Sequence, residues 1–240
     1  MGLNALLLSA GPGERLRPLT LFLPKCLLPA TSEGTMLKYW IKLLTEAGVD
    51  KIFVNVYWLK DKIMKYIDEM ENCYFDKVVI YEEFRLEPTG EVIDTLAGEL
   101  GNNFLIINSD TYINENQVRY FLANANVSEG YPICLGVSKH EDVSGKSLVE
   151  VEEGIVKSFI EKPGPQIGFS YAGILLMDIM ATQKRVCSLF CEKELTRHII
   201  PIFNGQMTAI DVGEVIDIGS SVEEYLYASQ EILRRQLNHG

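Results

Sequence analysis

Apolar side chains in the first half of the chain fall alternately into short continuous runs and into segments with helical spacing. Four short runs predict buried strands, at residues 4–8, 51–56, 77–81 and 103–108. Three segments predict helices with one apolar face, at residues 36–47, 61–70 and 91–99. Strands that alternate with helices indicate βαβ units on a mostly parallel sheet, because the crossover helices cover its faces.

The second half has a different pattern, in which strand-like runs follow one another. They lie at residues 132–137, 148–152, 155–160 and 170–177, and residues 222–237 predict a final helix. Glu153-Gly154 is expected to form the hairpin turn between the two middle strands. We therefore predict one Rossmann-like α/β domain over residues 1–240, with a mixed, mostly parallel sheet flanked by helices and a strand-rich half that begins near residue 113.

Charge and cysteine content narrow the possible partners. The chain has 22 Lys and Arg against 33 Asp and Glu, a formal net charge of −11. It has no block of basic residues, so neither nucleic acid nor an anionic membrane is an expected partner.

The first apolar run is too short to span a bilayer and lacks the basic region of a signal peptide. Five cysteines, an odd number without a CxxC pair, fit a reducing environment, and we expect a cytoplasmic protein.

Polar residues gather after the first strand, in the stretch LLLSAGPGERLRPLTLFLPK that ends at Lys25. Neither familiar phosphate loop fits this stretch. A dinucleotide fingerprint needs a third glycine where the chain has Leu16. The one Gly-Lys-Ser of the chain lacks the glycine that a Walker A loop carries five residues before it.

What remains in this stretch is a small-residue turn followed by two cations. Gly11 and Gly13 would let backbone N–H groups approach an anion closely. Arg15 can hold phosphate oxygens with its planar fork, and Lys25 adds a point charge. The same residues can also form a surface turn with solvated basic side chains. The residues by themselves favour neither interpretation.

Other polar residues follow later strands, at the edge where open α/β sheets bind ligands. Asp110 follows the fourth strand, and Asp217 precedes the last helix. Each aspartate by itself suits a turn or a helix N-cap better than a metal site. The Glu-Lys-Pro segment at 161–163 can be an exposed strand end closed by proline, and Gly90 can be a loop glycine before a helix.

The order of these motifs resembles the sugar-nucleotide pyrophosphorylases, nucleotidyltransferases that join a nucleoside triphosphate to a sugar 1-phosphate. Five segments carry the resemblance from about residue 4 to 232: LSAGPGERLRPLT…LPKCLLP, EPTGEVIDTL, FLIINSDTYI, FIEKP and VIDIGSSVEEYLYA. The chain is most similar to the short single-domain members, including those that serve heptose 1-phosphate or N-acetylmuramate 1-phosphate. The resemblance implies a nucleotide-binding half over about residues 1–112 and an acceptor-binding half over about 113–240.

The resemblance also assigns roles to individual residues. Asp110 and Asp217 would hold Mg²⁺, which prefers hard oxygen ligands. Arg15 and Lys25 would bind the triphosphate and complete the catalytic set. The implied nucleotide site comprises Ser9, Ala10, Gly11, Gly13, Glu14, Arg15, Lys25, Thr89 and Gly90. The implied acceptor site comprises Asp110, Glu161, Lys162 and Tyr171.

On the acceptor side, Lys162 would meet the phosphate and Glu161 the sugar hydroxyls. This side is also where the chain departs from the family pattern. Tyr171 stands in place of a common asparagine, Ser109 in place of a common glycine, and Glu91 in place of a common small residue. Tyr171 can line the acceptor site or face the core, and we weigh the two equally.

The expected partners are a nucleoside triphosphate and a sugar 1-phosphate, bound by a monomer or homodimer with Mg²⁺ as the cofactor. Two alternatives accompany this function. One is the same transfer to a non-sugar phosphate such as phosphocholine, and the other is a non-catalytic regulatory protein that binds nucleotide sugars. Regulatory proteins of this kind tend to lose a metal carboxylate or the loop cations, and this chain keeps both sets.

Overall fold

The computed structural model describes residues 2–70, 74, 76–186, 193–219 and 221–239. The chain groups into two compact units, each assembled from separated stretches. The first unit comprises Met1–Leu86, Asn108–Tyr112 and Ile216–Gly240, and the second comprises Glu87–Ile107 and Ile113–Val215. A single domain with halves that meet near residue 112 stays a prediction.

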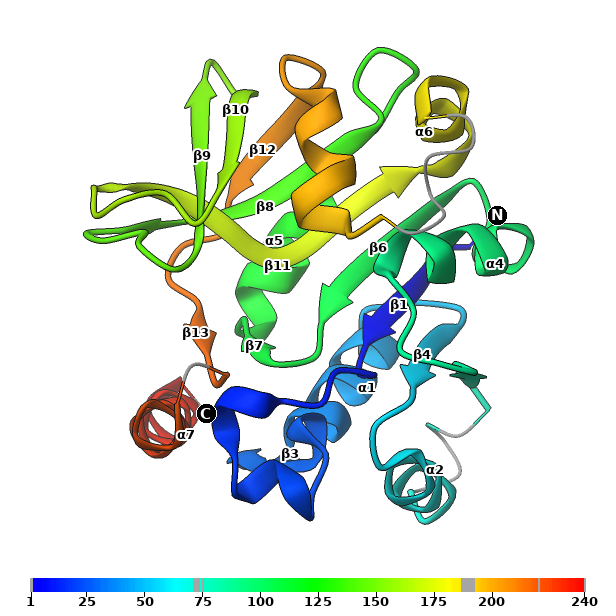
Figure 1. Cartoon of the computed structure of the whole chain (residues 1–240), viewed down its shortest axis with the longest axis vertical. Coiled ribbons are helices and arrows are strands. Elements are labelled where there is room, and N and C mark those ends of the chain that lie inside the picture. Colours follow the sequence, from blue (N-terminus) through cyan, green and yellow to red (C-terminus); the bar gives the residue numbers. More distant parts are fainter. Residues whose placement is uncertain (1, 71–73, 75, 187–192, 220, 240) are drawn as a thin grey trace. The chain divides into compact units, whose positions relative to one another are not determined.

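The first unit contains a parallel sheet in the order β5-β4-β1 (Figure 1). Its strands are β1 (Asn4–Leu8), β4 (Ile52–Val56) and β5 (Val78–Glu82). The register pairs Leu6 with Phe53 and Phe53 with Val79. All five residues of β4 are buried, as expected of a strand that is covered on both faces.

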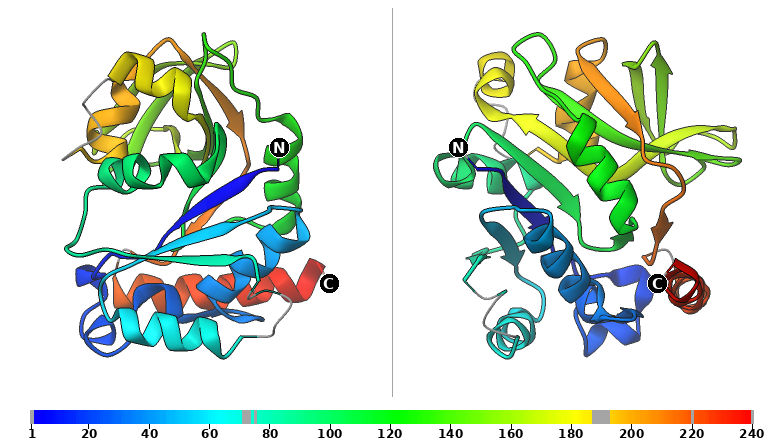
Figure 2. Two further views of the ribbon diagram at one scale, coloured as in Figure 1. Left: turned by 90° about the vertical axis from the view of Figure 1, so that its right-hand side faces the viewer. Right: turned by 180° about the vertical axis from the view of Figure 1, so that it is seen from behind.

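Two helices follow strands or turns of this sheet as the pattern predicts. Helix α1 (Met36–Glu46) begins at Thr35, whose side chain accepts a hydrogen bond from the Lys38 N–H. Seen from behind, α1 lies in front of the parallel strands (Figure 2). The Trp40 indole donates to the Thr111 carbonyl over 3.0 Å, which ties the helix to the Asn108–Tyr112 stretch of the same unit. Helix α2 (Lys60–Asp68) follows β4, so the predicted alternation of strand and helix is confirmed here.

Short elements and one long helix complete the first unit. The short elements are η1 (Glu14–Leu16), η2 (Leu19–Leu21), η3 (Lys25–Leu27), β2 (Pro29–Thr31), β3 (Gly34–Thr35), β7 (Thr111–Tyr112) and β13 (Ile216–Asp217). The predicted final helix is confirmed as α7 (Val222–His239), which packs beside β2. Tyr225 Oη donates to the Pro29 carbonyl over 2.6 Å, and the Ser32 N–H donates to Gln236 Oε1 over 2.7 Å.

The second unit contains the strand-rich part of the chain, in the order β6-β11-β8-β12-β10-β9. Its strands are β6 (Asn103–Asn108, of which the last residue belongs to the first unit), β8 (Ile133–His140), β9 (Ser147–Glu152), β10 (Ile155–Glu161), β11 (Gly168–Asp178) and β12 (Met207–Asp211). Strands β8 and β12 pair in parallel, whereas β11 pairs antiparallel with β6, β8 and β9, and β10 pairs antiparallel with β9 and β12. Its helical segments are α4 (Thr89–Leu100), α5 (Glu115–Asn124), α6 (Ile179–Val186), the π-helical turn η4 (Leu195–Ile199) and η5 (Ile200–Phe203).

The mixed α/β class is confirmed, with the parallel sheet in the first unit and the antiparallel hairpins in the second. Glu153 and Gly154 have φ angles of 51° and 77°, which confirms the predicted hairpin turn. Helix α5 was not predicted, because its buried residues are only Val118 and Phe121. A capping box at Asn114 starts that helix in place of a strong apolar face.

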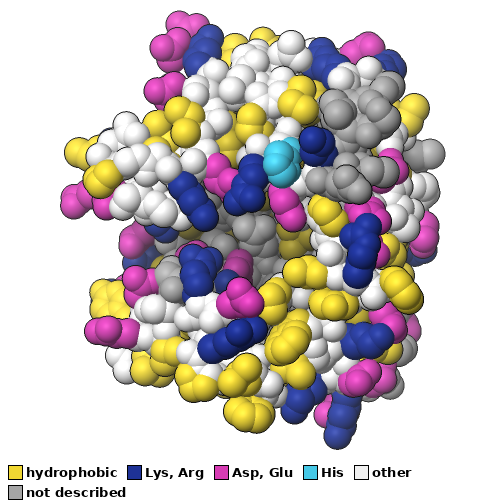
Figure 3. All heavy atoms as spheres, viewed as in Figure 1, with side chains coloured by type: hydrophobic (Ala, Val, Ile, Leu, Met, Phe, Trp, Pro, Cys, Tyr) yellow, Lys and Arg dark blue, Asp and Glu magenta, His cyan; other side chains and the backbone are white. Residues whose placement is uncertain are grey.

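The surface carries mixed charge. On the face seen in Figure 3, basic and acidic side chains are interspersed. Within the described part of the chain, no helix is both long and apolar enough to cross a membrane.

Candidate active site

A cavity of about 340 Å³ lies in the first unit, at the end of β1. Its volume falls in the range of small-molecule sites. The residues that line it are Leu8, Ser9, Gly11, Pro12, Gly13, Glu14, Arg15, Lys25, Ser109, Asp110 and Gly219. The predicted loop, its two cations and one of the two predicted metal carboxylates therefore share one cavity.

Gly13 is the residue that shapes the loop. Its φ of 60° is in the left-handed region, which favours glycine. A methyl group at this position would lie 2.9 Å from Thr20 Cγ2 and 3.3 Å from Lys25 Cβ. Thr20 Oγ1 in turn donates to the Gly13 carbonyl over 2.8 Å. The absent side chain therefore lets the turn pack against the segment that carries Lys25.

The two arginines of the loop have different surroundings. Arg15 is exposed and lines the cavity, so its guanidinium is accessible to an anion from solvent. Arg17 Nη2 lies 3.2 Å from Glu14 Oε1 in an exposed ion pair. Arg17 is not among the residues that line the cavity. Its contact is with Glu14, three residues before it in the sequence.

Buried polar groups of β4 and the residues after it hold the loop in place. The Ser9 N–H donates to Asn55 Oδ1 over 2.7 Å, and Asn55 Nδ2 donates to Glu83 Oε1 over 2.7 Å. The Trp58 N–H donates to the Ala10 carbonyl over 3.3 Å, and its indole to the Thr20 carbonyl over 2.8 Å. Sequence reasoning missed these supports, although an asparagine within the buried strand IFVNV was a usable signal.

Asp110 lies in the turn between β6 and β7, and its carboxylate forms an ion pair with the Lys25 ammonium. The Ser109 hydroxyl beside it donates to the Leu8 carbonyl over 2.6 Å, so that hydroxyl is directed to the end of β1. Asp217 ends β13, which pairs antiparallel with β7. The Ile218 N–H donates to the Asp110 carbonyl over 3.0 Å, which fixes the two aspartate segments side by side.

Gly219 lies against both Lys25 and Asp217. Its N–H donates to Asp217 Oδ1 over 2.6 Å. A methyl group at Gly219 would collide with the Lys25 ammonium nitrogen and would lie 2.9 Å from Asp217 Oδ1. Lys25 therefore lies beside Asp217 as well as Asp110, and the predicted pair of carboxylates flanks one cation.

These oxygens fit the predicted Mg²⁺ in their chemistry. Mg²⁺ is commonly bound through one or two carboxylates together with substrate phosphates. In the described part of the chain no group of three or more His, Cys, Asp or Glu could hold a metal ion by itself. Asp110 and Asp217 would accordingly hold Mg²⁺ jointly with phosphate oxygens of a substrate.

Cys26 is next to Lys25 but is not a candidate nucleophile. Its side chain is buried, and burial raises the pKa of the thiol to about 12. A thiol with this pKa stays protonated at neutral pH and is unreactive.

Of the four predicted acceptor residues, Asp110 belongs to the first unit, and Glu161, Lys162 and Tyr171 belong to the second. Glu161 ends β10, and Lys162 follows with a left-handed φ of 52°. The Lys162 N–H donates to the Lys146 carbonyl over 2.7 Å, so the backbone is held at this strained position. Thr196 Oγ1 donates to Glu161 Oε1 over 3.1 Å, and Arg197 Nε donates to Glu161 Oε2 over 3.0 Å. Sequence reasoning did not single out Thr196 or Arg197.

The remaining predicted residues also lie in the second unit. Gly90 is the second residue of α4, not a loop glycine, and its N–H donates to the Lys193 carbonyl over 2.9 Å. Thr89 is the first residue of the same helix. Tyr171 lies on β11 opposite Val137, and its N–H donates to Ser147 Oγ over 2.9 Å. Tyr171 is partly exposed as a residue, while its hydroxyl oxygen is buried, so its two predicted roles both stay open to experiment.

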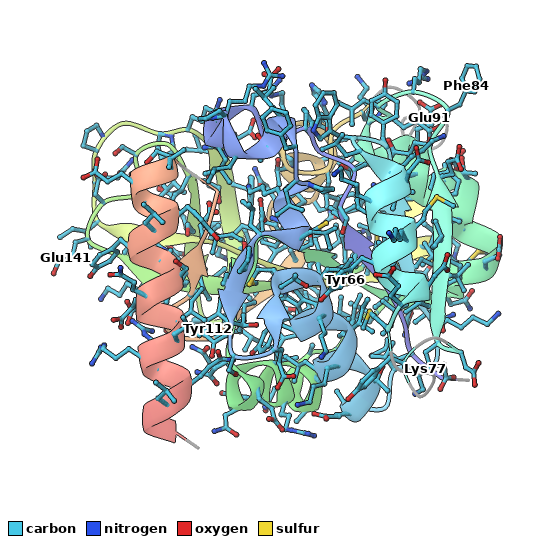
Figure 4. All side chains as sticks on the ribbon, turned by 90° about the horizontal axis from the view of Figure 1, so that it is seen from below. Tyr66, Lys77, Phe84, Glu91, Tyr112 and Glu141 are labelled. Carbon is cyan, nitrogen blue, oxygen red and sulfur yellow. The ribbon has the colours of Figure 1, made fainter. Side chains whose placement is uncertain are left out.

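The first unit carries several large apolar side chains that are exposed. Phe84 follows β5 and is 97% exposed, and its ring projects away from the ribbon in Figure 4. Phe22 and Tyr57 are exposed as well. Because Trp58 bonds to Thr20, the segments that carry Phe22 and Tyr57 are neighbours.

Comparison with known proteins agrees with this geometry. The chain matches the family model "Nucleotidyl transferase" over residues 4–177. Mannose-1-phosphate guanylyltransferase 1 of Arabidopsis thaliana is 30% identical over 185 residues, which cover 73% of this chain and 50% of that protein. The chain spans about half the length of the curated relatives that it matches.

Solved structures share the fold at low sequence identity. HddC from Yersinia pseudotuberculosis matches with a TM-score of 0.76 and 21% identity, covering 96% of this chain and 99% of that chain. The CTP:phosphocholine cytidylyltransferase LicC from Streptococcus pneumoniae matches with a TM-score of 0.74 and 19% identity, covering 97% and 100% of the two chains. The family match extends over well over half of the sequence and includes the loop and Asp110, and the chain therefore belongs to the nucleotidyl transferase family.

Proposed function

We propose that this chain catalyses Mg²⁺-dependent transfer of a nucleotidyl group from a nucleoside triphosphate to a sugar 1-phosphate, with release of pyrophosphate. The observation that carries the proposal is the single cavity that Arg15, Lys25 and Asp110 line, with Asp217 beside Lys25. Such a set of charges suits a polyphosphate, because the cations meet phosphate oxygens and the carboxylates provide metal ligands.

The reaction needs positioning and charge compensation more than proton transfer. A phosphate monoester has a second pKa of about 6, so the attacking oxygen is already charged at neutral pH. No histidine is among the described residues that line the cavity. The attacking oxygen would form a bond to the α-phosphorus while the bond to the pyrophosphate oxygen breaks, and the electron pair leaves with pyrophosphate.

Residues of the chain would oppose the charge that grows in this step. Arg15 would hold phosphate oxygens of the triphosphate with its planar fork. Lys25 would meet the charge that builds up on pyrophosphate, an interaction that is stronger in the transition state than in the ground state. Asp110 and Asp217 would hold Mg²⁺, which when bound supplies Lewis-acid stabilisation to phosphate oxygens.

Two residues of the second unit and the names of the relatives support the class of acceptor. Lys162 would bind the phosphate of the acceptor, and Glu161 would accept hydrogen bonds from sugar hydroxyls. The guanylyltransferase from Arabidopsis thaliana is named for mannose 1-phosphate, which supports a sugar 1-phosphate as the acceptor class. LicC is named for phosphocholine, so this acceptor belongs in the same test.

The test is a matrix of ATP, GTP, CTP, UTP and dTTP against a panel of sugar 1-phosphates and phosphocholine. Pyrophosphate release is measured with and without Mg²⁺, and Lys25→Ala serves as the matched low-activity control. We expect Mg²⁺-dependent release with at least one sugar 1-phosphate. Release with phosphocholine alone would change the acceptor class, and nucleotide-sugar binding without release from any pair would support the regulatory alternative.

A further inference from the structure

Glu161, the residue proposed to meet the acceptor hydroxyls, has both carboxylate oxygens engaged by a neighbouring turn. Oε1 accepts from Thr196 Oγ1 at 3.1 Å, and Oε2 accepts from Arg197 Nε at 3.0 Å. The Glu161 side chain is 29% exposed and that of Arg197 is 58% exposed. All three residues belong to the second unit.

The turn that provides these two donors has an unusual backbone. Residues Leu195–Ile199 form a π-helical turn, a rare geometry that is frequent at functional sites. Leu195 and Ile199 are buried and anchor its two ends. The Glu194 N–H donates to His198 Nδ1 over 2.9 Å, which closes the turn at its start. The buried ends thus fix two consecutive side chains, Thr196 and Arg197, against one carboxylate.

The ion pair changes the charge that an acceptor meets. The guanidinium of Arg197 offsets the carboxylate of Glu161, while the adjacent Lys162 is exposed. A carboxylate has about four lone-pair positions, so Glu161 can still accept hydrogen bonds from hydroxyl groups. Its charge, however, is already offset by Arg197, so Glu161 attracts a cationic group less strongly than an unpaired carboxylate would.

We infer that Arg197, supported by Thr196, is a positioning residue that fixes Glu161 and selects an acceptor phosphate with an uncharged, hydroxylated remainder over one that carries a cationic group. This inference rests on the proposed function and assigns its acceptor specificity. Sugar phosphates meet the selected description, whereas phosphocholine carries the disfavoured cation.

The experiment compares the wild-type protein with Arg197→Gln and Arg197→Lys. Arg119→Gln is the matched control, because Arg119 forms an exposed ion pair with Glu115 on α5 of the same unit. For each protein, kcat and KM are measured with the best sugar 1-phosphate, with phosphocholine and with the triphosphate. Melting temperature is recorded on the same samples.

We expect Arg197→Gln to raise the KM for the sugar 1-phosphate about tenfold, the size of one charge-assisted hydrogen bond at a partly exposed site. The ratio of kcat/KM for phosphocholine to that for the sugar phosphate should rise by a similar factor. The KM for the triphosphate should stay within about twofold. Arg197→Lys keeps the charge without the planar fork and should recover part of the loss.

Several outcomes would overturn the inference. They are an unchanged acceptor ratio in Arg197→Gln, an equal change in Arg119→Gln, and a wild-type preference for phosphocholine. If Arg197→Gln does not fold, Thr196→Val removes the other hydrogen bond and should shift the same ratio in the same direction. An active wild-type protein with an unchanged ratio removes the inference alone, whereas an inactive wild-type protein removes the proposed function and the inference with it.

Discussion

Gly219→Ala is a small substitution that should abolish most turnover without unfolding the protein. The added methyl group would collide with the Lys25 ammonium and would lie 2.6 Å from Lys25 Cε and 2.9 Å from Asp217 Oδ1. Lys25 Nζ is the end of a flexible side chain, so it is the group that moves. The ammonium would then leave its place beside the two aspartates.

Gly219→Ala should change the free energy of unfolding only slightly. The Lys25 and Asp110 side chains are 14% and 30% exposed, and a partly exposed ion pair contributes roughly 0.2–1 kcal/mol. Gly219 is not among the glycines with positive φ, so alanine gains roughly 0.4–1 kcal/mol through the unfolded chain. The two terms nearly cancel, and the melting temperature should change by no more than about 4 °C.

The catalytic effect is larger, because Lys25 would meet charge that forms only in the transition state. Loss of one such preorganised donor typically lowers kcat by about 10²–10³. Steady-state pyrophosphate release gives kcat and KM, and a thermal shift measurement gives stability. Gly98→Ala is the control, since Gly98 is exposed on α4 and a methyl group there meets nothing within 4 Å.

A double variant shows whether the effect passes through Lys25. If Gly219→Ala acts only by displacing that side chain, Gly219→Ala combined with Lys25→Ala should be no slower than Lys25→Ala alone. Additive losses would show a second effect at Asp217. A kcat for Gly219→Ala within about twofold of the wild type would refute the reasoning about Lys25 itself.

Four further predictions concern other residues. Asp110→Asn and Asp217→Asn should each lower kcat by orders of magnitude with an unchanged fold by circular dichroism, because amides hold Mg²⁺ poorly; near wild-type kcat at saturating Mg²⁺ would remove that residue from the proposed metal site. Lys162→Ala should mainly raise the KM for the acceptor, because the phosphate is charged before and during reaction; a change confined to kcat would contradict this role. Tyr171→Asn should alter the ranking of acceptors if the side chain lines the site, whereas a lower melting temperature with an unchanged ranking would make it structural. Burial raises the pKa of Cys26 to about 12, so this thiol should resist iodoacetamide in the native protein at about pH 8 and react after unfolding in guanidinium; rapid alkylation of the native protein would contradict its burial.

Periodic apolar residues were enough to predict the elements that form the cores of the two units. The strand β1 agrees with its predicted bounds, and β4, β5, α1 and α7 differ from theirs by one or two residues. Burial of a whole face requires a regular apolar pattern, and such a pattern is visible without a structure. Helix α5 and strand β12 escaped prediction, because each is short and carries few buried apolar residues.

The candidate site likewise contains residues that the sequence indicates and a contact that only the fold creates. The glycine-rich turn and its cations are consecutive in the sequence, so local spacing and the family resemblance indicated Gly13, Arg15 and Lys25 together. The ion pair of Lys25 with Asp110 joins residues 85 positions apart and forms only when η3 meets the turn after β6.

Tertiary structure alone decided which polar groups support the site. Asn55 lies 46 residues from Ser9, and Arg197 lies 36 residues from Glu161. Neither asparagine nor arginine belongs to a local motif at these positions. A buried or paired polar side chain takes its role from the partner that satisfies it, and only the folded chain brings that partner within hydrogen-bond distance.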